Sequence, residues 1–246
     1  MCLIEFGGGS SRKIRLLLDR LKPESYVPVD ISKRHLETSS RRIHDDYSWL
    51  NVYPVYADYT SDFSLPSSVG SARRVAFFPG SSIGNFDPEA ALDFMHRIAR
   101  LVGPGGALLI GVDLKKERAI LEAAYDDAAG VTAEFNRNVL KHLNAALGAD
   151  FDATNFSHVA LYNETLGCIQ MFLESTVAQT VLIGGTSIEF HAGERIHTEN
   201  SFKHNPAEFG AMAGKAGFRR EACWTDEEDR FAVFLFVATD GVEVVS

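Results

Sequence analysis

Residues 1–13 read MCLIEFGGGSSRK, and this stretch decides the fold class of the chain. CLIEF is mostly apolar and runs directly into glycines, which predicts a short buried strand that ends in a tight turn. Beyond the turn, apolar residues recur at helical spacing and predict one buried helical face: Ile14, Leu17, Leu18 and Leu21. A strand, a glycine-rich turn and a helix in this order are typical of nucleotide-binding α/β folds.

Strands and helices continue to alternate after this first unit. Strands are expected at 26–32, 52–60, 73–80 and 107–114, and helices at 33–47 and 88–101. Alternation with short connections predicts a parallel sheet that carries helices on both faces. The expected fold class is therefore α/β, with a doubly wound and mainly parallel sheet.

The second half of the chain has a different pattern. A mostly helical stretch at 117–147 is interrupted at 126–130, and strands in antiparallel succession are expected at 158–164, 168–175 and 179–185. A helix ending at Gly217 and a closing strand at 230–239 follow. We expect an α/β core at 1–114, a substrate-binding insertion at 115–200, and a return to the core sheet at 201–246.

Composition excludes several classes of partner. The formal net charge is −9, so neither nucleic acid nor an anionic membrane surface is expected to bind. The cysteines Cys2, Cys168 and Cys223 show no CxxC spacing, so no disulfide framework and no metal site are expected. No apolar run approaches the ~20 residues of a membrane span. These features predict a cytoplasmic protein, which we expect to be a monomer.

Acidic residues near the strand ends indicate which cofactor the core binds. Asp30 ends the second strand, where a carboxylate can accept hydrogen bonds from ribose hydroxyls. The turn GGGSSRK lacks the third glycine of GxGxxG, and Glu5 would repel a pyrophosphate but attract a sulfonium and an ammonium. These details favour S-adenosylmethionine over a dinucleotide, with Asp58 as a second acid at the third strand's end. Glu5 and Asp58 could instead cap neighbouring backbone amides.

Four polar residues in the rest of the chain could bind a substrate. Asn85, after the fourth strand, could hold an amine and a carboxylate, or could only shape a turn. Glu199 and Ser201 alternate on an extended segment, so they could read a ring with two nitrogens, or belong to a polar loop. Tyr125 ends a helix, and the polar cluster 136–138 on the next helix could be only its solvated side, which is the expectation for Arg137.

Four segments together resemble the histidine-specific N-α-methyltransferases of ergothioneine biosynthesis: FPGSSIGNF, GVDLKK, AYDDAAGVTAEFNRNVLKHLNAALGADFD and TENSFKH. The likeness runs along essentially the whole chain, and AYDDxxGVTAxFNRNVL is a long and unusual motif. The resemblance implies the seven-stranded, Rossmann-like sheet of class I methyltransferases, with an inserted helical and antiparallel-strand substrate subdomain. It also implies S-adenosylmethionine as cofactor and L-histidine as the small-molecule substrate.

The resemblance further implies three successive methyl transfers to the α-amine of histidine, which give the betaine hercynine. The family's cofactor positions fall on Gly7, Lys13, Asp30 and Asp58. Its positions for the amine and carboxylate of the amino acid fall on Gly80, Asn85 and Tyr125, of which Asn85 and Tyr125 would orient the reacting amine. Its positions that line and read the side-chain pocket fall on Met171, Glu199 and Ser201.

Other readings stay open at this point. Family members carry a mainly helical segment before the first strand, whereas this strand follows Met1 almost directly, so the amino-acid pocket is expected to lack that cover. The chain could then be a cofactor-binding relative with little activity. It could also methylate another amino-acid-derived amine. A nicotinamide-dependent dehydrogenase shares this fold, but Glu5 and the missing third glycine argue against one.

Overall fold

The computed structural model describes residues 1–8 and 12–240, so Gly9 and Ser10 of the opening turn lie outside the described residues. The chain forms two compact units. We call Met1–Ile83, Pro88–Leu114 and His204–Ser246 the core unit, and Gly84–Asp87 with Lys115–Lys203 the inserted unit. The expected domain limits at residues 114 and 200 stay a prediction, because compactness alone does not show that each part folds by itself.

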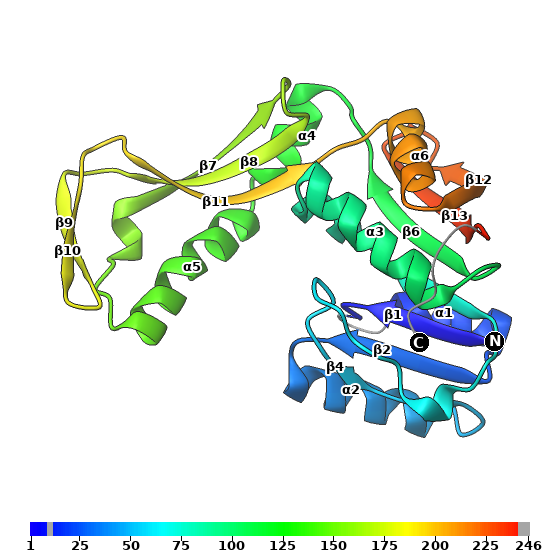
Figure 1. Cartoon of the computed structure of the whole chain (residues 1–246). Helices are drawn as coiled ribbons and strands as arrows, with labels where there is room; N and C mark the ends of the chain where they lie inside the picture. Colours follow the sequence, from blue (N-terminus) through cyan, green and yellow to red (C-terminus); the bar gives the residue numbers. More distant parts are fainter. Residues whose placement is uncertain (9–11, 241–246) are drawn as a thin grey trace. The chain divides into compact units, whose positions relative to one another are not determined.

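The core unit is built on one large sheet (Figure 1). Its strands are β1 (Cys2–Phe6), β2 (Ser25–Asp30), β3 (Asn51–Val52), β4 (Val55–Tyr56), β5 (Arg74–Phe78), β6 (Ala107–Asp113), β12 (Phe218–Thr225) and β13 (Phe231–Ala238). They lie in the order β12-β13-β6-β5-β1-β2-β3, with β4 also paired to β2. All pairs from β6 to β4 are parallel, and β13 alone runs in the opposite direction, since it pairs antiparallel with both β6 and β12. The expected doubly wound, mainly parallel α/β sheet is therefore confirmed.

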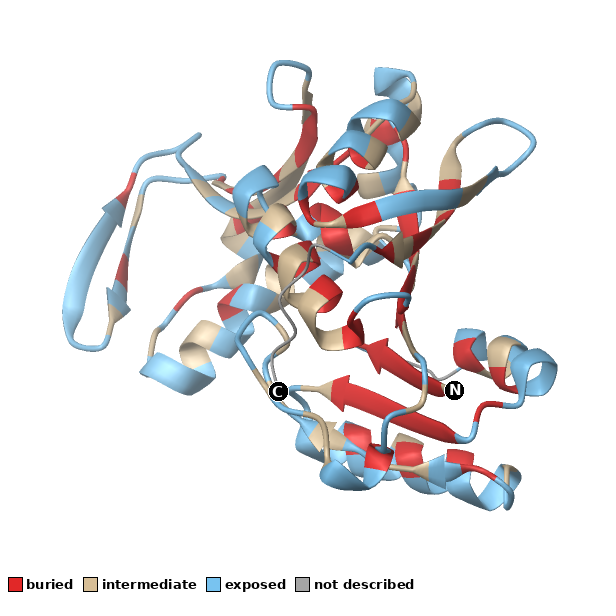
Figure 2. Cartoon of the chain, turned by 45° about the vertical axis from the view of Figure 1, so that its right-hand side comes forward, coloured by how far each residue is buried: buried red, intermediate tan, exposed pale blue. Residues whose placement is uncertain are grey.

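Helices cover both faces of this sheet, as the apolar strands require. The core unit's helices are α1 (Arg12–Leu21), α2 (Lys33–Asp46), α3 (Pro88–Val102), α6 (Pro206–Lys215) and the short 3-10 helix η1 (Ser67–Val69). Every residue of β1 is buried (Figure 2). Leu3 packs in a cluster with α1 and α2, whereas Phe6 stacks edge-on against Phe94 of α3. Successive residues of β1 thus face opposite layers, as strand geometry dictates.

Two details of the core sheet differ from the sequence expectation. The third strand, expected to be continuous at 52–60, is broken into β3 and β4 by Tyr53 and Pro54. Tyr53 N–H still donates to Tyr26 O, but Pro54 has no N–H to continue the ladder. The edge strand β12 was not expected, because its run of Arg219, Arg220 and Glu221 is polar and exposed.

The inserted unit pairs two helices with a three-stranded antiparallel sheet in the order β11-β8-β7. Its elements are η2 (Ser82–Asn85, which starts in the core unit), α4 (Arg118–Tyr125), α5 (Val131–Leu147), η3 (Ala153–Asn155), β7 (Phe156–Asn163), β8 (Cys168–Ser175), β9 (Gln179–Ile183), β10 (Thr186–Phe190) and β11 (Arg195–Phe202). β7 and β8 pair as expected, but β9 does not continue the succession. It pairs with β10 in a separate hairpin, because Gly184 and Gly185 take positive φ and turn the chain back.

The break between α4 and α5 has a clear local cause. Gly130 takes a φ of +71°, and the Asp127 carboxylate accepts hydrogen bonds from Val131 N and Thr132 N at 3.0 and 2.8 Å. These bonds satisfy amides at the start of α5 that have no partner within the helix. They also hold the pKa of Asp127 down at about 2. α4 therefore ends at Tyr125, and α5 begins as a separate helix at Val131.

Among the described residues, no helix is both long and apolar enough to cross a membrane.

Candidate functional site

The turn after β1 exposes backbone in the core unit. Gly7 has a φ of +63°, a conformation that favours glycine, and its N–H donates to Val29 O at 3.0 Å. A Cβ added to Gly8 would lie 2.9 Å from Oε2 of Glu5. Both positions therefore depend on glycine, and the predicted cofactor turn has no side chain at residues 7 and 8. Gly9 lies outside the described residues.

Glu5 is an acid in the interior of the core unit. It is 1 % exposed, and its Oε2 accepts a hydrogen bond from the Tyr26 hydroxyl at 2.5 Å. Burial raises the pKa of Glu5 to about 7, with a smaller rise from Asp30 and opposing effects of Tyr26 and Lys13. Because its pKa lies so high, the carboxyl takes a proton readily near neutral pH, and a cation bound beside it would favour the ionised form.

Lys13 and Gly80 are brought together at this end of the sheet. Nζ of Lys13 lies 3.4 Å from the position that a Cβ on Gly80 would occupy, and Gly80 has a φ of +80°. The neighbouring Ser81, with a φ of +64°, uses its hydroxyl to accept a hydrogen bond from Asp113 N at 2.8 Å. A non-glycine residue with positive φ stores strain that often marks a functional loop.

Asp30 and Asp58 both shape their own turns. Asp30 accepts from Ser32 N at 2.8 Å, and Asp58 accepts from the N–H and hydroxyl of Thr60 at 2.9 and 2.7 Å. The Thr60 hydroxyl is the main cause of a lowered pKa of Asp58. The capping alternative is thus real for Asp58, and Asp30 caps its own turn in the same way. Capping uses one oxygen of each carboxylate in these bonds, so it does not exclude a ligand role.

Tyr59 links these groups and was missed by the sequence analysis. Its ring stacks edge-on against Phe6, and its hydroxyl lies 3.7 Å from where a Cβ on Gly7 would be. Burial raises the pKa of Tyr59, and the charges of Asp30 and Asp58 raise it further. The available sequence signal was an aromatic residue directly after Asp58. A pocket of about 200 Å³ continues from Tyr59 along residues 61–65 to α3, and none of the predicted site residues lines it.

The inserted unit brings together the residues predicted to read a side chain. Glu199 of β11 is the direct register partner of Met171 on β8, so the two side chains share a face of the sheet. Ser201 lies two residues further along that strand, and the strand alternation puts it on the same face. Burial raises the pKa of the half-buried Glu199, while the positive charge of Lys203 opposes the rise. The segment 195–202 is therefore a strand, and the alternative of a polar loop is wrong.

A buried lysine, absent from the sequence expectations, joins this group. Nζ of Lys203 donates to the hydroxyl of Tyr125 at 2.7 Å and to Oγ of Ser201 at 2.8 Å. The two hydroxyls are 2.7 Å apart. Lys203 is 2 % exposed, and its ammonium lies 4.5 Å from the centroid of the Tyr125 ring. The sequence signal was its spacing, two residues after Ser201.

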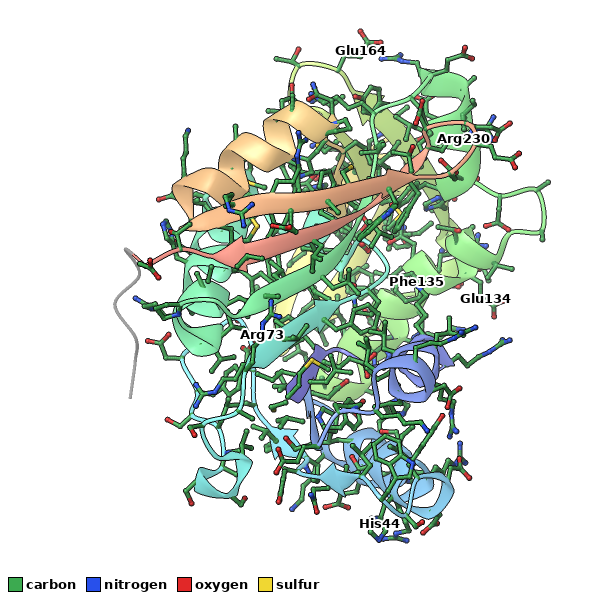
Figure 3. The ribbon with its side chains drawn as sticks, turned by 90° about the vertical axis from the view of Figure 1, so that its right-hand side faces the viewer. His44, Arg73, Glu134, Phe135, Glu164 and Arg230 are labelled. Carbon is green, nitrogen blue, oxygen red and sulfur yellow. The ribbon has the colours of Figure 1, made fainter. Side chains whose placement is uncertain are left out.

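Tyr125 is also fixed through its backbone by a buried polar chain. Asn136 Nδ2 donates to Phe172 O and meets Nδ1 of His158, at 3.0 and 2.9 Å. Because an amide NH₂ has only donors, His158 Nδ1 must accept, and its Nε2–H donates to Tyr125 O at 2.7 Å. Of the polar cluster 136–138, Asn136 does not lie on the solvated side of α5, since it is 1 % exposed. Instead Phe135 of α5 is exposed, next to Glu134 (Figure 3).

Asn85 lies at the end of η2, in the short part of the inserted unit that approaches β11. A Cβ on Gly84 would lie 2.8 Å from Phe202 O and 3.4 Å from Ser201 Oγ, so only glycine permits this approach. Asn85 itself is exposed. The structure thus brings Asn85, Tyr125, Met171, Glu199 and Ser201 into one unit, and Gly7, Lys13, Asp30, Asp58 and Gly80 into the other.

Comparisons with known proteins show which family the chain resembles. Residues 1–238 match the model of a family described as histidine-specific, S-adenosylmethionine-dependent methyltransferases. A histidine N-alpha-methyltransferase of Mycobacterium tuberculosis is 39 % identical over 239 residues, which cover 95 % of this chain and 74 % of that protein. Ergothioneine biosynthesis protein 1 of Schizosaccharomyces pombe is 26 % identical over 88 % of this chain and 29 % of its own length.

Solved structures agree on the fold. The CcbJ methyltransferase of Streptomyces caelestis superposes with a TM-score of 0.54 at 17 % identity, covering 96 % of this chain and 83 % of that one. At this identity the likeness supports the fold alone, which is that of S-adenosylmethionine-dependent methyltransferases.

Proposed function

Because the chain belongs to the histidine-specific, S-adenosylmethionine-dependent methyltransferases, we propose that it methylates the α-amine of L-histidine up to the trimethyl betaine, in ergothioneine biosynthesis. The methyl donor follows from the family. The choice of histidine rests on one observation above all: a carboxylate, Glu199, and a hydroxyl, Ser201, lie on one face of β11 beside Met171. An imidazole ring has two nitrogens that such a pair can bind.

The residues of the core unit fit S-adenosylmethionine. The glycines at 7 and 8 leave backbone bare, and an added Cβ at Gly8 would collide with Glu5. Glu5 is a buried acid that a cationic ligand would stabilise in its ionised form. We assign Gly7, Lys13, Asp30 and Asp58 to cofactor binding, with the two aspartates accepting from ribose and adenine donors.

S-adenosylmethionine supplies a methyl group on a cationic sulfur, and its sulfur leaves neutral, so no acid needs to act on the leaving group. The α-amine must be uncharged to attack. Free α-amino groups in peptides titrate at ~7.7–8.0, so a neutral fraction exists without a dedicated base. Correct positioning can then supply roughly 7–11 kcal/mol in favourable cases.

The chain's own contribution to catalysis is therefore orientation. We assign Asn85 and Tyr125 to the amine and carboxylate of the amino acid, together with the backbone at Gly80. The fixed backbone of Tyr125, held by His158, suits such a role because it limits the motion of the ring. Repeated methylation requires the amine to rotate while the carboxylate and the imidazole stay bound, which anchors at both ends of the amino acid would allow.

The proposal is tested by incubating the protein with S-adenosylmethionine and L-histidine and following products by mass spectrometry. Mono-, di- and trimethylhistidine are expected, and tryptophan and tyramine serve as competing amines. Cofactor binding without any methylated histidine would contradict the proposed activity. Faster methylation of another amine would replace histidine as the substrate but keep the reaction.

A further inference from the structure

The connection between β4 and β5 leaves a pocket in the core unit. The crossover connections from β1 to β2, from β2 to β3 and from β5 to β6 each carry an α-helix, as is usual between parallel strands. In the described stretch 57–73, between β4 and β5, the chain forms only the 3-10 helix η1. A pocket of about 200 Å³ lies between residues 59–65 of this stretch and the last turns of α3. The missing crossover helix explains why this face is not fully packed.

The lining of this pocket carries a positive charge although the chain as a whole is acidic. Arg74, Arg97 and Arg100 line it against one acid among the described lining residues, Asp62, whereas the net charge of the chain is −9. Nη1 of Arg74 donates to Leu101 O near the end of α3 at 2.8 Å. Nη2 of Arg100 lies 3.6 Å from Oδ1 of Asp62 in an exposed ion pair. These contacts account for two of the arginines and leave Arg97 to be explained.

Arg97 has a buried nitrogen without a partner. Its Nε is buried, and no described residue accepts a hydrogen bond from it. A buried donor on a charged group is costly to leave unpaired, so a bound acceptor would stabilise this side chain. Nε and a neighbouring Nη of arginine form a planar edge that matches the two oxygens of a carboxylate. The side chain is therefore suited to bind an anion of that shape.

Much of the remaining wall is apolar and indicates what such an anion would carry. Phe63 and Leu65 line the pocket from the connection, and Ile98 and Leu101 line it from α3. A cavity of about 150 Å³ can hold benzene, so a pocket of about 200 Å³ has room for one ring and its carboxylate. Inorganic phosphate would pair with Arg97 but would leave these apolar side chains in contact with water. A ligand with an apolar body would cover them.

We propose that this pocket binds a small organic monocarboxylate whose apolar body is about the size of one ring, with Arg97 as the group that pairs with the carboxylate. None of the described residues that line the pocket is assigned to the cofactor or to the amino acid, so the site is a further one. The inference does not depend on the proposed function. Asp62 in the lining and Asp58 nearby disfavour a second negative charge on the ligand.

The pocket adjoins the predicted cofactor residues. Tyr59 lines it and directly follows Asp58 in the chain. The pKa of Asp58 is lowered mainly by hydrogen bonds from Thr60, and the positive charge of Arg97 lowers it further. Arg97 therefore lies close enough to act on a predicted cofactor residue, although its own Nε has no partner there.

Isothermal titration calorimetry with benzoate as the probe tests the proposal. Benzoate should bind the wild-type chain with a Kd of about 1 mM or tighter. Benzamide, which is neutral and nearly the same shape, and inorganic phosphate, which has no apolar body, should each bind at least about tenfold more weakly. Arg97→Met should weaken benzoate binding at least about tenfold, because it removes a charged hydrogen-bond donor. Arg97→Lys keeps the charge but loses the planar edge, so it should also weaken binding.

A matched control and a check of folding accompany the variants. Arg41→Met removes an exposed arginine of α2 and should leave benzoate binding unchanged. Thermal unfolding followed by circular dichroism shows whether each variant is folded. If Arg97→Met does not fold, Arg97→Lys and the comparison of benzoate with benzamide on the wild-type chain carry the test.

Three outcomes would overturn the proposal. The first is a wild-type chain that does not bind benzoate, or that binds benzamide equally well. The second is benzoate binding that a folded Arg97→Met variant retains in full, since the probe would then sit elsewhere. The third is phosphate binding as tight as that of benzoate, since the apolar wall would then contribute nothing.

Discussion

At the scale of single residues, Glu5 shows how a buried acid that suits a cationic ligand can also lower the stability of the folded chain near neutral pH. Its carboxyl is desolvated in the core unit and has the Tyr26 hydroxyl as hydrogen-bond donor, and its pKa is about 7. At pH values between the ordinary pKa of 4.5 and the raised pKa of about 7, Glu5 keeps its proton in the folded chain but has lost it in the unfolded chain. The contribution to stability is therefore full below pH 4.5 and is lost as the pH rises to 7.

We predict a pH-dependent difference between the wild type and Glu5→Gln, whose amide does not titrate. The shift corresponds to about 3 kcal/mol. The free energy of unfolding of the wild type, relative to the variant, should fall by about that amount between pH 4.5 and pH 7.5, measured by urea denaturation. Parallel curves for the two proteins over this range would show that Glu5 titrates normally.

Glu199 should matter for substrate binding and not for the cofactor. Losing a hydrogen bond to a charged group costs about 1.5–3 kcal/mol, so Glu199→Ala should raise the KM for histidine roughly 10- to 100-fold. S-adenosylhomocysteine affinity, measured by calorimetry, should stay unchanged. Glu189→Ala on β10 is a matched exposed control. An equal loss of both affinities in Glu199→Ala would argue for a structural role.

Residue roles were only partly open to prediction from the sequence. Acids at strand ends and a Glu–Ser alternation can be recognised locally. The structure puts Asp30 at the end of β2 and Glu199 and Ser201 on one strand, but Asp58 lies in a turn two residues after β4. Tyr59 and Lys203 carry only a weak local signal, because their importance comes from contacts across large sequence separations. Lys203 lies 78 residues from Tyr125 along the chain.

At the scale of elements, α5 turns a polar side chain inward and apolar ones outward. Asn136 is buried and bridges α5 to β7 and β8 through His158 and Phe172 O, while Phe135 is 64 % exposed. Helical periodicity could not reveal this orientation, because the partners of Asn136 lie on other elements. The buried amide therefore fixes the rotation of α5 against the sheet.

Asn136→Ala should destabilise the chain by about 2 kcal/mol, because it leaves Phe172 O and His158 Nδ1 without their donor. Chemical denaturation followed by circular dichroism gives the value. Asn138→Ala, which removes an exposed contact with His142, should stay within about 0.5 kcal/mol of wild type. Equal effects of the two substitutions would show that burial of Asn136 contributes nothing.

Strands and helices with a strong hydrophobic pattern were predicted from the sequence. Polar strands that form only because they pair with a neighbouring strand were not. β1, β5, β6 and β13 are apolar runs that any core would bury. β12 and β10 are polar edge or hairpin strands, and their pairing partners determine them. The split of the third strand into β3 and β4 could have been anticipated from Pro54, which breaks any ladder.

At the scale of the whole molecule, the residues predicted to bind the two ligands fall mainly into two different units. The predicted cofactor residues lie in the core unit, and most of the predicted amino-acid residues lie in the inserted unit. The inserted unit has its own apolar cluster, which includes Leu140, Phe156 and Leu173. Each ligand should therefore stabilise mainly the unit that holds its residues.

Hydrogen exchange measured by mass spectrometry should show this division directly. S-adenosylhomocysteine at 100 times its dissociation constant suppresses openings by about 2.7 kcal/mol, so amides whose exchange requires site opening should slow about 100-fold. We expect that protection in segments 1–8 and 57–60. Histidine added afterwards should protect 118–125 and 195–203 in the same way. Protection by histidine confined to the core unit would contradict the assignment of its binding residues, since nothing in 118–125 or 195–203 would then hold the ring.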